Sequence, residues 1–509
     1  MDKKRFVINL MSNFLSALSG LGLSFFLTPY LVETLGKEAY GFYPLSNNFI
    51  MYTGIITTAL NSMAGRYITI SLEQKDIRKV NVYFNSVLFG NILISMFFVL
   101  LGILVCFFID AILHVPVALL GDIRLLFILI FLGLIINVSS SVFSVAAFAV
   151  NRLDKLAVQN IIVNILKLTI IIVLFYFCIP RIYFLGVVTV ITSLYFFYAN
   201  YKITRSLLPE VYINISLFSR SAVMLLVGSG IWNSILALSN VINTQLDLLI
   251  ANHFYQASGM GTLSLTKFVP TTIQLLLGII VPVFLPEMIK AYAQNNISKL
   301  KEILNFSFKA IFLIVLVPLS VFIVYGDDFF RLWLPGEDHL KLYYISVLTL
   351  IPFIIHATIE TVYHVFVVTN KLRITSFFGM GMALFNFILA LGLCYYSQLG
   401  IYSIPVAALI SGCINHLIFT PLYASYCLQE SRWYFISKII RGLLGFTGLL
   451  LITYVWKSCK LIYVASWEGL IINVSLTGFV LSVTVLFLRF DRKILVQLFQ
   501  KFKKQVYDT

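Results

Sequence analysis

Charged residues are scarce in this 509-residue sequence, at 11% of the chain, whereas hydrophobic residues make up 60%. Soluble domains average about 25% charged and about 45–50% apolar residues. Such a composition leaves too little polar surface to cover a water-soluble particle, and it excludes a disordered chain, a coiled coil and a secreted disulfide scaffold. The sequence therefore predicts an all-α protein, a polytopic transmembrane bundle.

Clustered cysteines and long polar loops are also absent. The six cysteines are scattered, mostly within apolar runs, so the sequence predicts neither a disulfide framework nor a metal site. The longest predicted external loop spans only residues 326–344, which leaves no room for a soluble catalytic domain. We therefore expect a protein that is not an enzyme and that needs no cofactor.

Apolar runs separated by short polar segments predict about fourteen transmembrane helices. The first run is too long for the core of a signal peptide, so we expect it to be retained as a span. The predicted spans are residues 8–32, 42–70, 82–109, 125–150, 160–178, 186–201, 222–249, 262–285, 310–325, 345–368, 377–396, 403–427, 442–456 and 470–488.

The positions of lysine and arginine support this arrangement. With the N-terminus in the cytoplasm, 26 of the 36 basic residues lie in cytoplasmic segments, seven in external segments and three within spans. This bias follows the positive-inside rule, so both termini are predicted to be cytoplasmic. The net charge of +15 then reflects orientation in the membrane, and no nucleic-acid partner is expected.

A weak internal repeat recurs at an offset of about 220 residues. Residues 36–41 parallel residues 256–261, and Asn151-Arg-Leu matches Asn370-Lys-Leu. Two six-helix halves of equal orientation predict a substrate cavity at their interface, as in repeat-built transporters, although duplication can also build a plain scaffold. The predicted parts are an N-terminal six-helix lobe (1–205), a C-terminal six-helix lobe (206–428), appended helices 13 and 14 (429–488) and a basic amphipathic cytoplasmic tail (489–509).

Polar residues recur at helical spacing inside several predicted spans. Unpaired polar groups and charges are costly in an apolar setting, so such stripes indicate either a lined cavity or helix-packing seams. Long basic side chains can also reach the membrane surface from within a span. The predicted substrate-contacting residues are Asn61, Arg66, Lys167, Asn240, Thr244, Lys267 and Gln274.

The balance of charge within the spans is positive. Only Asp247 and Glu360 oppose the three intramembrane cations, and a cationic cavity suits an anionic phosphate or pyrophosphate head group. In the tenth span, His356, Glu360 and His364 follow at i, i+4 and i+8. Together with Asp247 they are interpreted as either ion-coupling or structural residues, because histidine titrates near neutral pH. The spacing does not fit a zinc site.

Five further segments follow one another along the chain: Leu35–Tyr43, Asn61–Tyr67, Asp247–Leu265, Arg331–Gly336 and Thr369–Leu372. They resemble motifs of bacterial polysaccharide flippases of the O-antigen (Wzx) type. These proteins belong to the multidrug/oligosaccharidyl-lipid/polysaccharide exporter superfamily. The segments occur in order over about residues 1–430, and Arg66 matches an arginine of the family's second span.

This resemblance implies alternating access between two six-helix lobes through a cationic central cavity in the bacterial cell membrane. The implied substrate is an undecaprenyl-pyrophosphate-linked oligosaccharide that moves from the inner to the outer leaflet. Implied partners are membrane lipids, H⁺ or Na⁺ as coupling ion, and polysaccharide assembly proteins. A lipid II flippase and a drug/cation antiporter of the same superfamily are the alternatives, and a membrane glycan polymerase or ligase is a more distant one.

Overall fold

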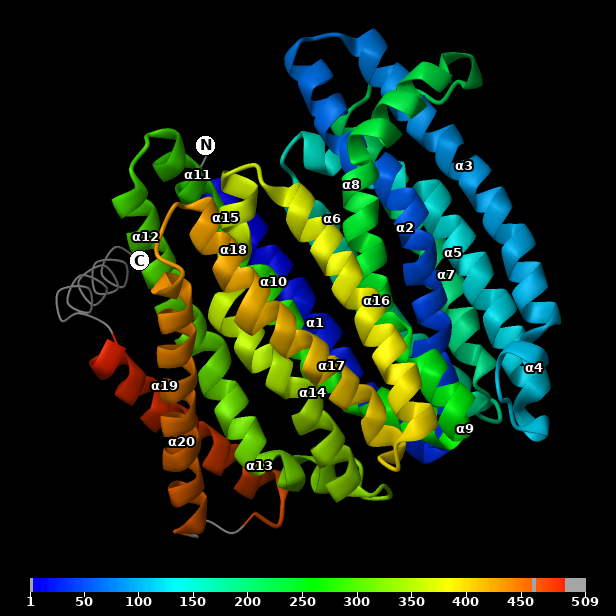
Figure 1. Ribbon diagram of the computed structural model, residues 1–509. Coiled ribbons are helices and arrows are strands. Elements are labelled where there is room, and N and C mark those ends of the chain that lie inside the picture. Colours follow the sequence, from blue (N-terminus) through cyan, green and yellow to red (C-terminus); the bar gives the residue numbers. More distant parts are fainter. Residues whose placement is uncertain (1–2, 460–463, 490–509) are drawn as a thin grey trace, which may run out of the picture. The chain divides into compact units, whose positions relative to one another are not determined.

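The computed structural model describes residues 3–459 and 464–489 (Figure 1). All regular secondary structure within these ranges is helical. Lipid offers the backbone no hydrogen-bond partners, so long apolar segments satisfy their own N–H and C=O groups as helices. The prediction of an all-α, polytopic bundle is confirmed. The predicted tail lies outside the described residues, apart from Arg489.

The chain divides into two compact units, and the first comprises Met1–Phe268 and Ser376–Ile404. Its helix α2 packs against α3, α5, α8 and α9, and α5 packs along α7. The long helices are α1 (Lys3–Leu35), α2 (Lys37–Glu73), α3 (Ile77–Phe107), α5 (Leu120–Ala149), α6 (Leu153–Phe177), α7 (Tyr183–Leu207), α8 (Arg220–Gln245), α9 (Asp247–Thr266) and most of α16 (Leu372–Tyr396).

The second compact unit comprises Val269–Thr375 and Pro405–Thr509. Helix α13 packs against α14, α19 and α20. The helices are α10 (Phe268–Ile280), α11 (Leu285–Ala293), α12 (Ile297–Ile311), α13 (Val317–Trp333), α14 (His339–Ile359), α15 (Tyr363–Val368), α17 (Ser403–Cys413), α18 (Thr420–Cys427), α19 (Trp433–Ser458) and α20 (Trp467–Arg489). Short 3₁₀ or π segments join several of them: η3 (Val281–Phe284), η4 (Phe312–Leu316), η5 (Glu360–Val362) and η7 (Ile414–Phe419).

Every one of the predicted spans falls on helix in the structure. Twelve segments of the described chain are long and apolar enough to cross a membrane. Helix α2 is not among them because its polar stripe lowers its hydropathy, although it has 37 residues. The predicted seventh and eighth spans lie largely within a single helical run, Ser234–Ala293, which is interrupted by a left-handed residue at Gln256 (φ 58°).

Two pairs of helix ends support the internal repeat. Lys75 and Asn295, like Asn151 and Asn370, have positive φ values between 53° and 57°. In each case the left-handed residue donates its N–H to the carbonyl three residues earlier, and the next N–H bonds to the carbonyl five residues before it. This Schellman pattern ends the preceding helix at equivalent positions of the two halves.

The next helix also begins in the same way in both halves. Asp76 caps α3 by accepting the N–H of Lys79 at 3.0 Å, and Asn296 caps α12 by accepting the N–H of Lys299 at 2.9 Å. The hydrogen bond from the Lys79 N–H, together with the Lys79 ammonium beside the carboxylate, lowers the pKa of the Asp76 carboxyl below its ordinary value.

Two equivalent glycines contact each other where α2 crosses α9. A Cβ on Gly41 would lie 2.9 Å from the Cα of Gly261, and a Cβ on Gly261 would lie 2.9 Å from the carbonyl carbon of Lys37. Only glycine permits this approach of two backbones. Contact between residues at offset 220 is expected where a pseudo-two-fold axis of the repeat runs between them.

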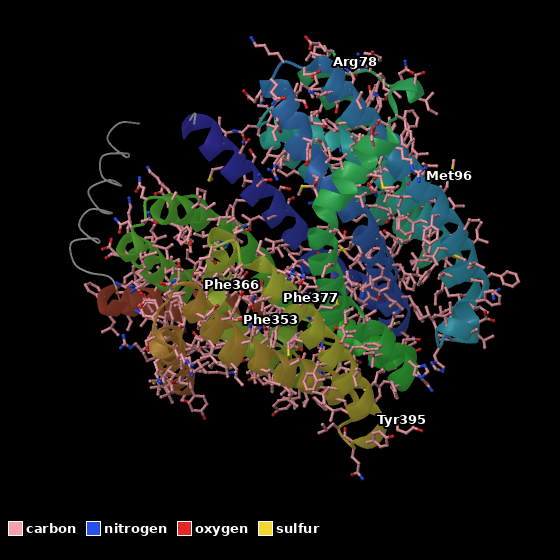
Figure 2. All side chains as sticks on the ribbon, turned by 45° about the horizontal axis from the view of Figure 1, so that its top comes forward. Arg78, Met96, Phe353, Phe366, Phe377 and Tyr395 are labelled. Atoms are coloured by element: carbon pink, nitrogen blue, oxygen red, sulfur yellow. The ribbon has the colours of Figure 1, made fainter. Side chains whose placement is uncertain are left out.

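The compact units do not coincide with the sequence repeats, because α8, α9 and most of α16 group with helices of the first half. The lobes 1–205 and 206–428 are defined by the repeat and stay a prediction. Many large apolar side chains are exposed on the first unit, including Met96 (60%) and Tyr395 (74%). Both are labelled in Figure 2. Such surfaces suit lipid contact.

Candidate functional site

An ion pair joins two of the predicted site residues in the first unit. The Lys267 ammonium lies 2.6 Å from the Asp247 carboxylate and donates a 2.9 Å hydrogen bond to the Thr244 carbonyl. Asp247 begins α9 and Lys267 follows its last residue. A straight helix of this length would separate them by about 30 Å, so the chain must reverse at Gln256.

Helix α2 holds the junction that positions Asp247. Asn48 and Tyr52 both donate hydrogen bonds of 2.9 Å to the Gln245 carbonyl, between α8 and α9. The predicted polar face of α8 leads into this junction: the Thr244 hydroxyl donates to the Asn240 carbonyl at 2.8 Å, and the Asn240 side chain is exposed. The structure thus places Thr244, Asp247 and Lys267 together.

Arg66 and Lys167 have no carboxylate beside them among the residues that the structure describes. Arg66 on α2 is exposed and Lys167 on α6 is half-buried, and neither forms an ion pair within the part of the chain that the structure describes. One turn before Lys167, Asn164 donates a 2.8 Å hydrogen bond to Ser19 on α1, which fixes this face of α6. Both cations are therefore uncompensated by a described acid.

Asn61 lies in a network that packs three helices. Its side-chain oxygen accepts hydrogen bonds from Asn91 on α3 at 2.9 Å and from Ser141 on α5 at 3.3 Å. These two hydrogen bonds account for a polar side chain at Asn61 without a ligand. A role of Asn61 in substrate binding stays a prediction. Gln274, on α10 of the second unit, is exposed.

The second unit brings His356 and Glu360 together with a histidine from another span. His356 Nε2 pairs with the Glu360 carboxylate, and the His356 ring centroid lies 4.5 Å from that of His416. The Tyr363 hydroxyl lies 3.2 Å from His416 Nδ1 and 3.1 Å from the Thr420 hydroxyl. We call His356, Glu360 and His416 the histidine cluster.

His364 is not part of this cluster, although its spacing predicted a common face with the other two. Its Nε2 lies 3.1 Å from the Val281 carbonyl instead. The α-helix breaks at Ile359 (φ −129°, ψ 6°), and the 3₁₀ segment η5 follows. Because a 3₁₀ turn has fewer residues than an α-turn, it rotates the following side chains away from the predicted face.

His416 and Tyr363 are the site residues that the sequence-based prediction missed. A histidine within the apolar span 403–427 was the available signal, but it stands alone in its own segment. Within the described ranges, no group of three or more His, Cys, Asp or Glu residues is arranged to hold a metal ion.

A second ionic site joins α13, α19 and the segment before α20. Asp328 pairs with Arg331 and with Lys457, each at 2.7 Å. Lys457 also donates to the Val324 carbonyl at 2.8 Å, and Arg331 donates to the Val464 carbonyl at 2.6 Å. Two cations, each also bonded to a backbone carbonyl, thus surround one largely buried carboxylate, so we interpret the site as structural.

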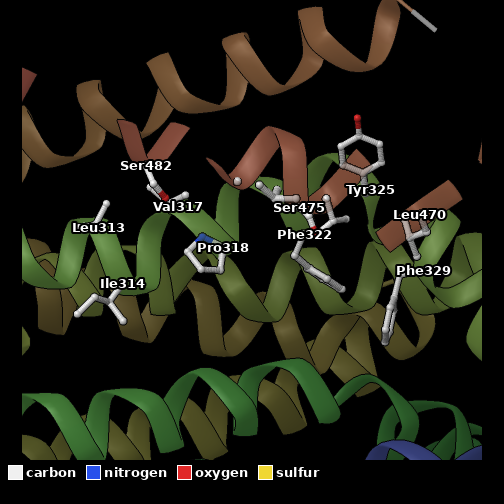
Figure 3. A pocket seen from close by; sticks show the side chains of 13 residues that line it. Leu313, Ile314, Val317, Pro318, Phe322, Tyr325, Phe329, Leu470, Ser475 and Ser482 are labelled. Carbon is white, nitrogen blue, oxygen red and sulfur yellow. The ribbon is translucent and has the colours of Figure 1, made fainter. Parts of the chain in front are cut away.

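An apolar cavity of about 480 Å³ lies between α13 and α20 (Figure 3). Phe322 and Phe329 of α13 and Leu470 of α20 line it, with Ser475 and Ser482 as sparse polar groups. Its walls suit a hydrocarbon chain better than a sugar or a phosphate.

No protein-family model matches the chain. It is 26% identical over 516 residues to an uncharacterised membrane protein, EpsK of Bacillus subtilis strain 168, with 99% of each chain covered. An inward-facing multidrug-resistance transporter of the MATE family of the MOP superfamily superposes with a TM-score of 0.68 at 13% identity, over 84% of this chain and 99% of the other. The chain has the fold of the MOP-superfamily transporters.

Two further solved structures are similar to the chain in fold. The lipid II flippase MurJ, in an inward closed conformation, superposes with a TM-score of 0.62 at 15% identity, over 94% of this chain and 98% of its own. A MOP-superfamily transporter from Pyrococcus furiosus, described as having a binding pocket of reversed polarity, gives 0.54 at 14% identity, over 84% and 96%.

Proposed function

We propose that this protein is a flippase that moves an undecaprenyl-pyrophosphate-linked oligosaccharide from the inner to the outer leaflet of the bacterial cell membrane. One observation carries the proposal: a chain with the MOP fold keeps two cations within its membrane helices, Arg66 and Lys167, without a described acidic partner.

The distribution of charge favours an anionic substrate. The two intramembrane acids are already engaged, Asp247 by Lys267 and Glu360 by His356. The positive charge of Arg66 and Lys167 is thus left for a ligand, and arginine matches pyrophosphate oxygens as a bidentate donor. Organic cations would meet repulsion at the same positions, which disfavours the drug/cation antiporter.

The proposed substrate has a polar head, which needs a hydrated environment, and a prenyl tail, which needs an apolar one. A sugar–pyrophosphate head cannot cross hydrocarbon unaided, so a polar path through the protein carries it by alternating access. The prenyl tail stays in an apolar environment, and the apolar side chains that line the cavity between α13 and α20 offer such an environment. MurJ matches more of the chain than the MATE transporter does, which fits a flippase with the additional helices α19 and α20.

Lipid II remains the second candidate, because it presents the same prenyl-pyrophosphate chemistry and MurJ is a lipid II flippase. A polymerase or ligase is disfavoured because the structural neighbours are transporters. We expect both termini in the cytoplasm, H⁺ or Na⁺ as coupling ion, and polysaccharide assembly proteins as partners.

Reconstitution in liposomes tests the proposal. A fluorescent undecaprenyl-pyrophosphate oligosaccharide is placed in both leaflets, and membrane-impermeant quencher reports the fraction that the protein makes accessible. We expect rapid movement by the wild type and strong loss with Arg66→Gln. The matched variant Arg78→Gln, in the first turn of α3, should move the substrate like the wild type. Movement of lipid II but not of the oligosaccharide lipid would replace the substrate, and movement of an organic cation alone would refute the flippase.

A further inference from the structure

We infer that an anionic glycerophospholipid of the inner leaflet binds by its phosphate group between α12 and α19, where Lys309, Lys438 and Arg441 come together. We call these three residues the basic cluster. The inference goes beyond the proposed function, because it concerns a lipid that the protein holds and not the lipid that it moves.

The start of α19 is held against α12 by Tyr434. The Lys301 ammonium of α12 lies 5.2 Å from the centre of the Tyr434 ring, and the Asn305 side chain is a hydrogen-bond partner of the Tyr434 hydroxyl. Lys301 also pairs with Glu430, in the segment before α19. These contacts place α12 and α19 side by side at the ends that are predicted to be cytoplasmic.

The basic cluster lies further along the same two helix faces. Lys309 follows eight residues after Lys301 on α12. Lys438 and Arg441 follow four and seven residues after Tyr434 on α19. The Lys438 ammonium lies 5.6 Å from the centre of the Tyr434 ring and within electrostatic range of both Lys309 and Arg441. Three positive charges thus meet where the two helices face each other.

Such an arrangement of charges is unfavourable without an anion. Like charges repel, both across the two helices and between Lys438 and Arg441, which are three residues apart on one helix. Lys309 and Lys438 are half-buried, so solvent ions screen them less than they screen exposed lysines. The carboxylate of Glu430 is already engaged by Lys301. A phosphate group removes the repulsion, because its oxygens accept hydrogen bonds from several cations at once.

The equivalent face of α3 in the first half carries no charge. At the offset of 220, Asn81 donates a 3.1 Å hydrogen bond to the Glu210 carbonyl, at the place where the second half has its Lys301–Glu430 ion pair. The same two positions therefore touch in both halves. Further along α3, Phe89 stands in place of the second lysine of α12. Neutral side chains satisfy this face of the fold, so the fold itself does not require the lysines of α12.

The surroundings of the basic cluster favour a lipid over a free anion. Trp433, at the start of α19, is exposed, as is typical of tryptophan at the level of the lipid head groups. Lys438 follows about 7.5 Å further along the helix, where the head groups meet the hydrocarbon. Phe306 of α12 and Ile440 of α19 are exposed next to the cluster and suit acyl chains. Basic clusters at the cytoplasmic side recognise anionic lipid head groups.

The thermal unfolding temperature of the full-length protein in a neutral detergent tests the inference. We expect phosphatidylglycerol to raise this temperature in the wild type, whereas phosphatidylcholine, which has no net charge, should not. Lys309→Gln and Lys438→Gln should each weaken the apparent affinity for phosphatidylglycerol by about five- to tenfold. Lys438→Arg should keep the affinity, because the charge is retained. The matched control is Lys299→Gln, which removes an exposed lysine of α12 outside the cluster.

A measurement without added lipid separates binding from folding. Lys309→Gln and Lys438→Gln should then unfold at or above the wild-type temperature, because each substitution removes repulsion between like charges. A lower unfolding temperature in both variants without lipid would assign the two lysines to the fold and overturn the inference.

Three further results would overturn it. The first is an unchanged affinity for phosphatidylglycerol in both glutamine variants. The second is equal stabilisation by inorganic phosphate, which would make the cluster a site for a free anion. The third is tighter binding of undecaprenyl pyrophosphate than of phosphatidylglycerol, lost in the same variants, which would assign the cluster to the substrate. Because none of these measurements involves transport, the inference and the proposed function fail separately.

Discussion

The ion pair between Asp247 and Lys267 makes a prediction that separates its structural role from its role in transport. We consider Asp247→Asn, Lys267→Met and the double variant. Each single substitution leaves one charge without its partner at the α8–α9 junction. The double variant removes both charges, so it avoids the unpaired charge and loses only their attraction.

The magnitude of the coupling free energy between Asp247 and Lys267 follows from the geometry of the ion pair. At an effective dielectric constant of about 20, unit charges 2.6 Å apart attract by about 6 kcal/mol. Desolvation of each ion offsets several kcal/mol, and the side chains are 22% and 23% exposed, which screens the pair further. We therefore expect a net coupling of about 2 kcal/mol, within the range for hydrogen bonds to charged groups.

Unfolding in mixed micelles with increasing sodium dodecyl sulfate measures this coupling. The two single variants should together lose about 2 kcal/mol more than the double variant loses. Strictly additive losses would refute the ion pair. Liposome transport, measured on the same proteins, then tests the proposed substrate contact: Lys267→Met and the double variant should both be inactive while folded. Normal transport by the double variant would make the pair purely structural.

Three further predictions concern the cations, the glycine contact and the topology. Arg66→Ala should strongly reduce glycan export at normal protein abundance. Arg66→Lys should keep part of the export, because lysine retains the positive charge but not the two parallel hydrogen bonds of the guanidinium group. Full export by the alanine variant would contradict a role of Arg66 in binding. Gly261→Val should destabilise the protein by about 1–3 kcal/mol in the micelle assay. Gly228→Val should not, because an added Cβ at Gly228 would meet no atom within 4 Å. Equal effects of the two substitutions would argue against the close approach of Gly41 and Gly261. In a cysteine-free background, a cysteine at Lys75 should be labelled from the cytoplasm and one at Lys37 from outside, and the reverse would overturn the orientation.

The positions of the helices could be predicted because hydropathy acts locally. Most of the apolar runs are long enough to cross a bilayer, and lipid forces such a run to be helical. Interruptions of a helix by one or a few residues change the hydropathy of the segment too little to be recognised in the sequence. The 3₁₀ turn after Ile359 lies inside a predicted span, and the sequence does not distinguish it from continuous helix. The reversal at Gln256, by contrast, falls in the predicted loop between the seventh and eighth spans.

The candidate site could be predicted only where its residues share one segment. His356 and Glu360 are four residues apart and do pair, as the spacing predicted. Their third partner is His416, which a different span supplies, and a single sequence carries no record of that proximity. Lys267 and Asp247 were both recognised as intramembrane charges, but their pairing depends on the reversal at Gln256.

The contact between Gly41 and Gly261 has a consequence for how such a fold can arise. If one six-helix chain dimerised about a two-fold axis, a single glycine codon would place the same residue against its own copy. Any substitution there would add a side chain on both sides of the contact at once and would therefore increase the steric clash twofold. After fusion into one chain, the two positions can vary independently, yet each is still confined to glycine by the backbone of the other. The restriction to glycine at both positions therefore persists after the sequence symmetry that produced it has been lost.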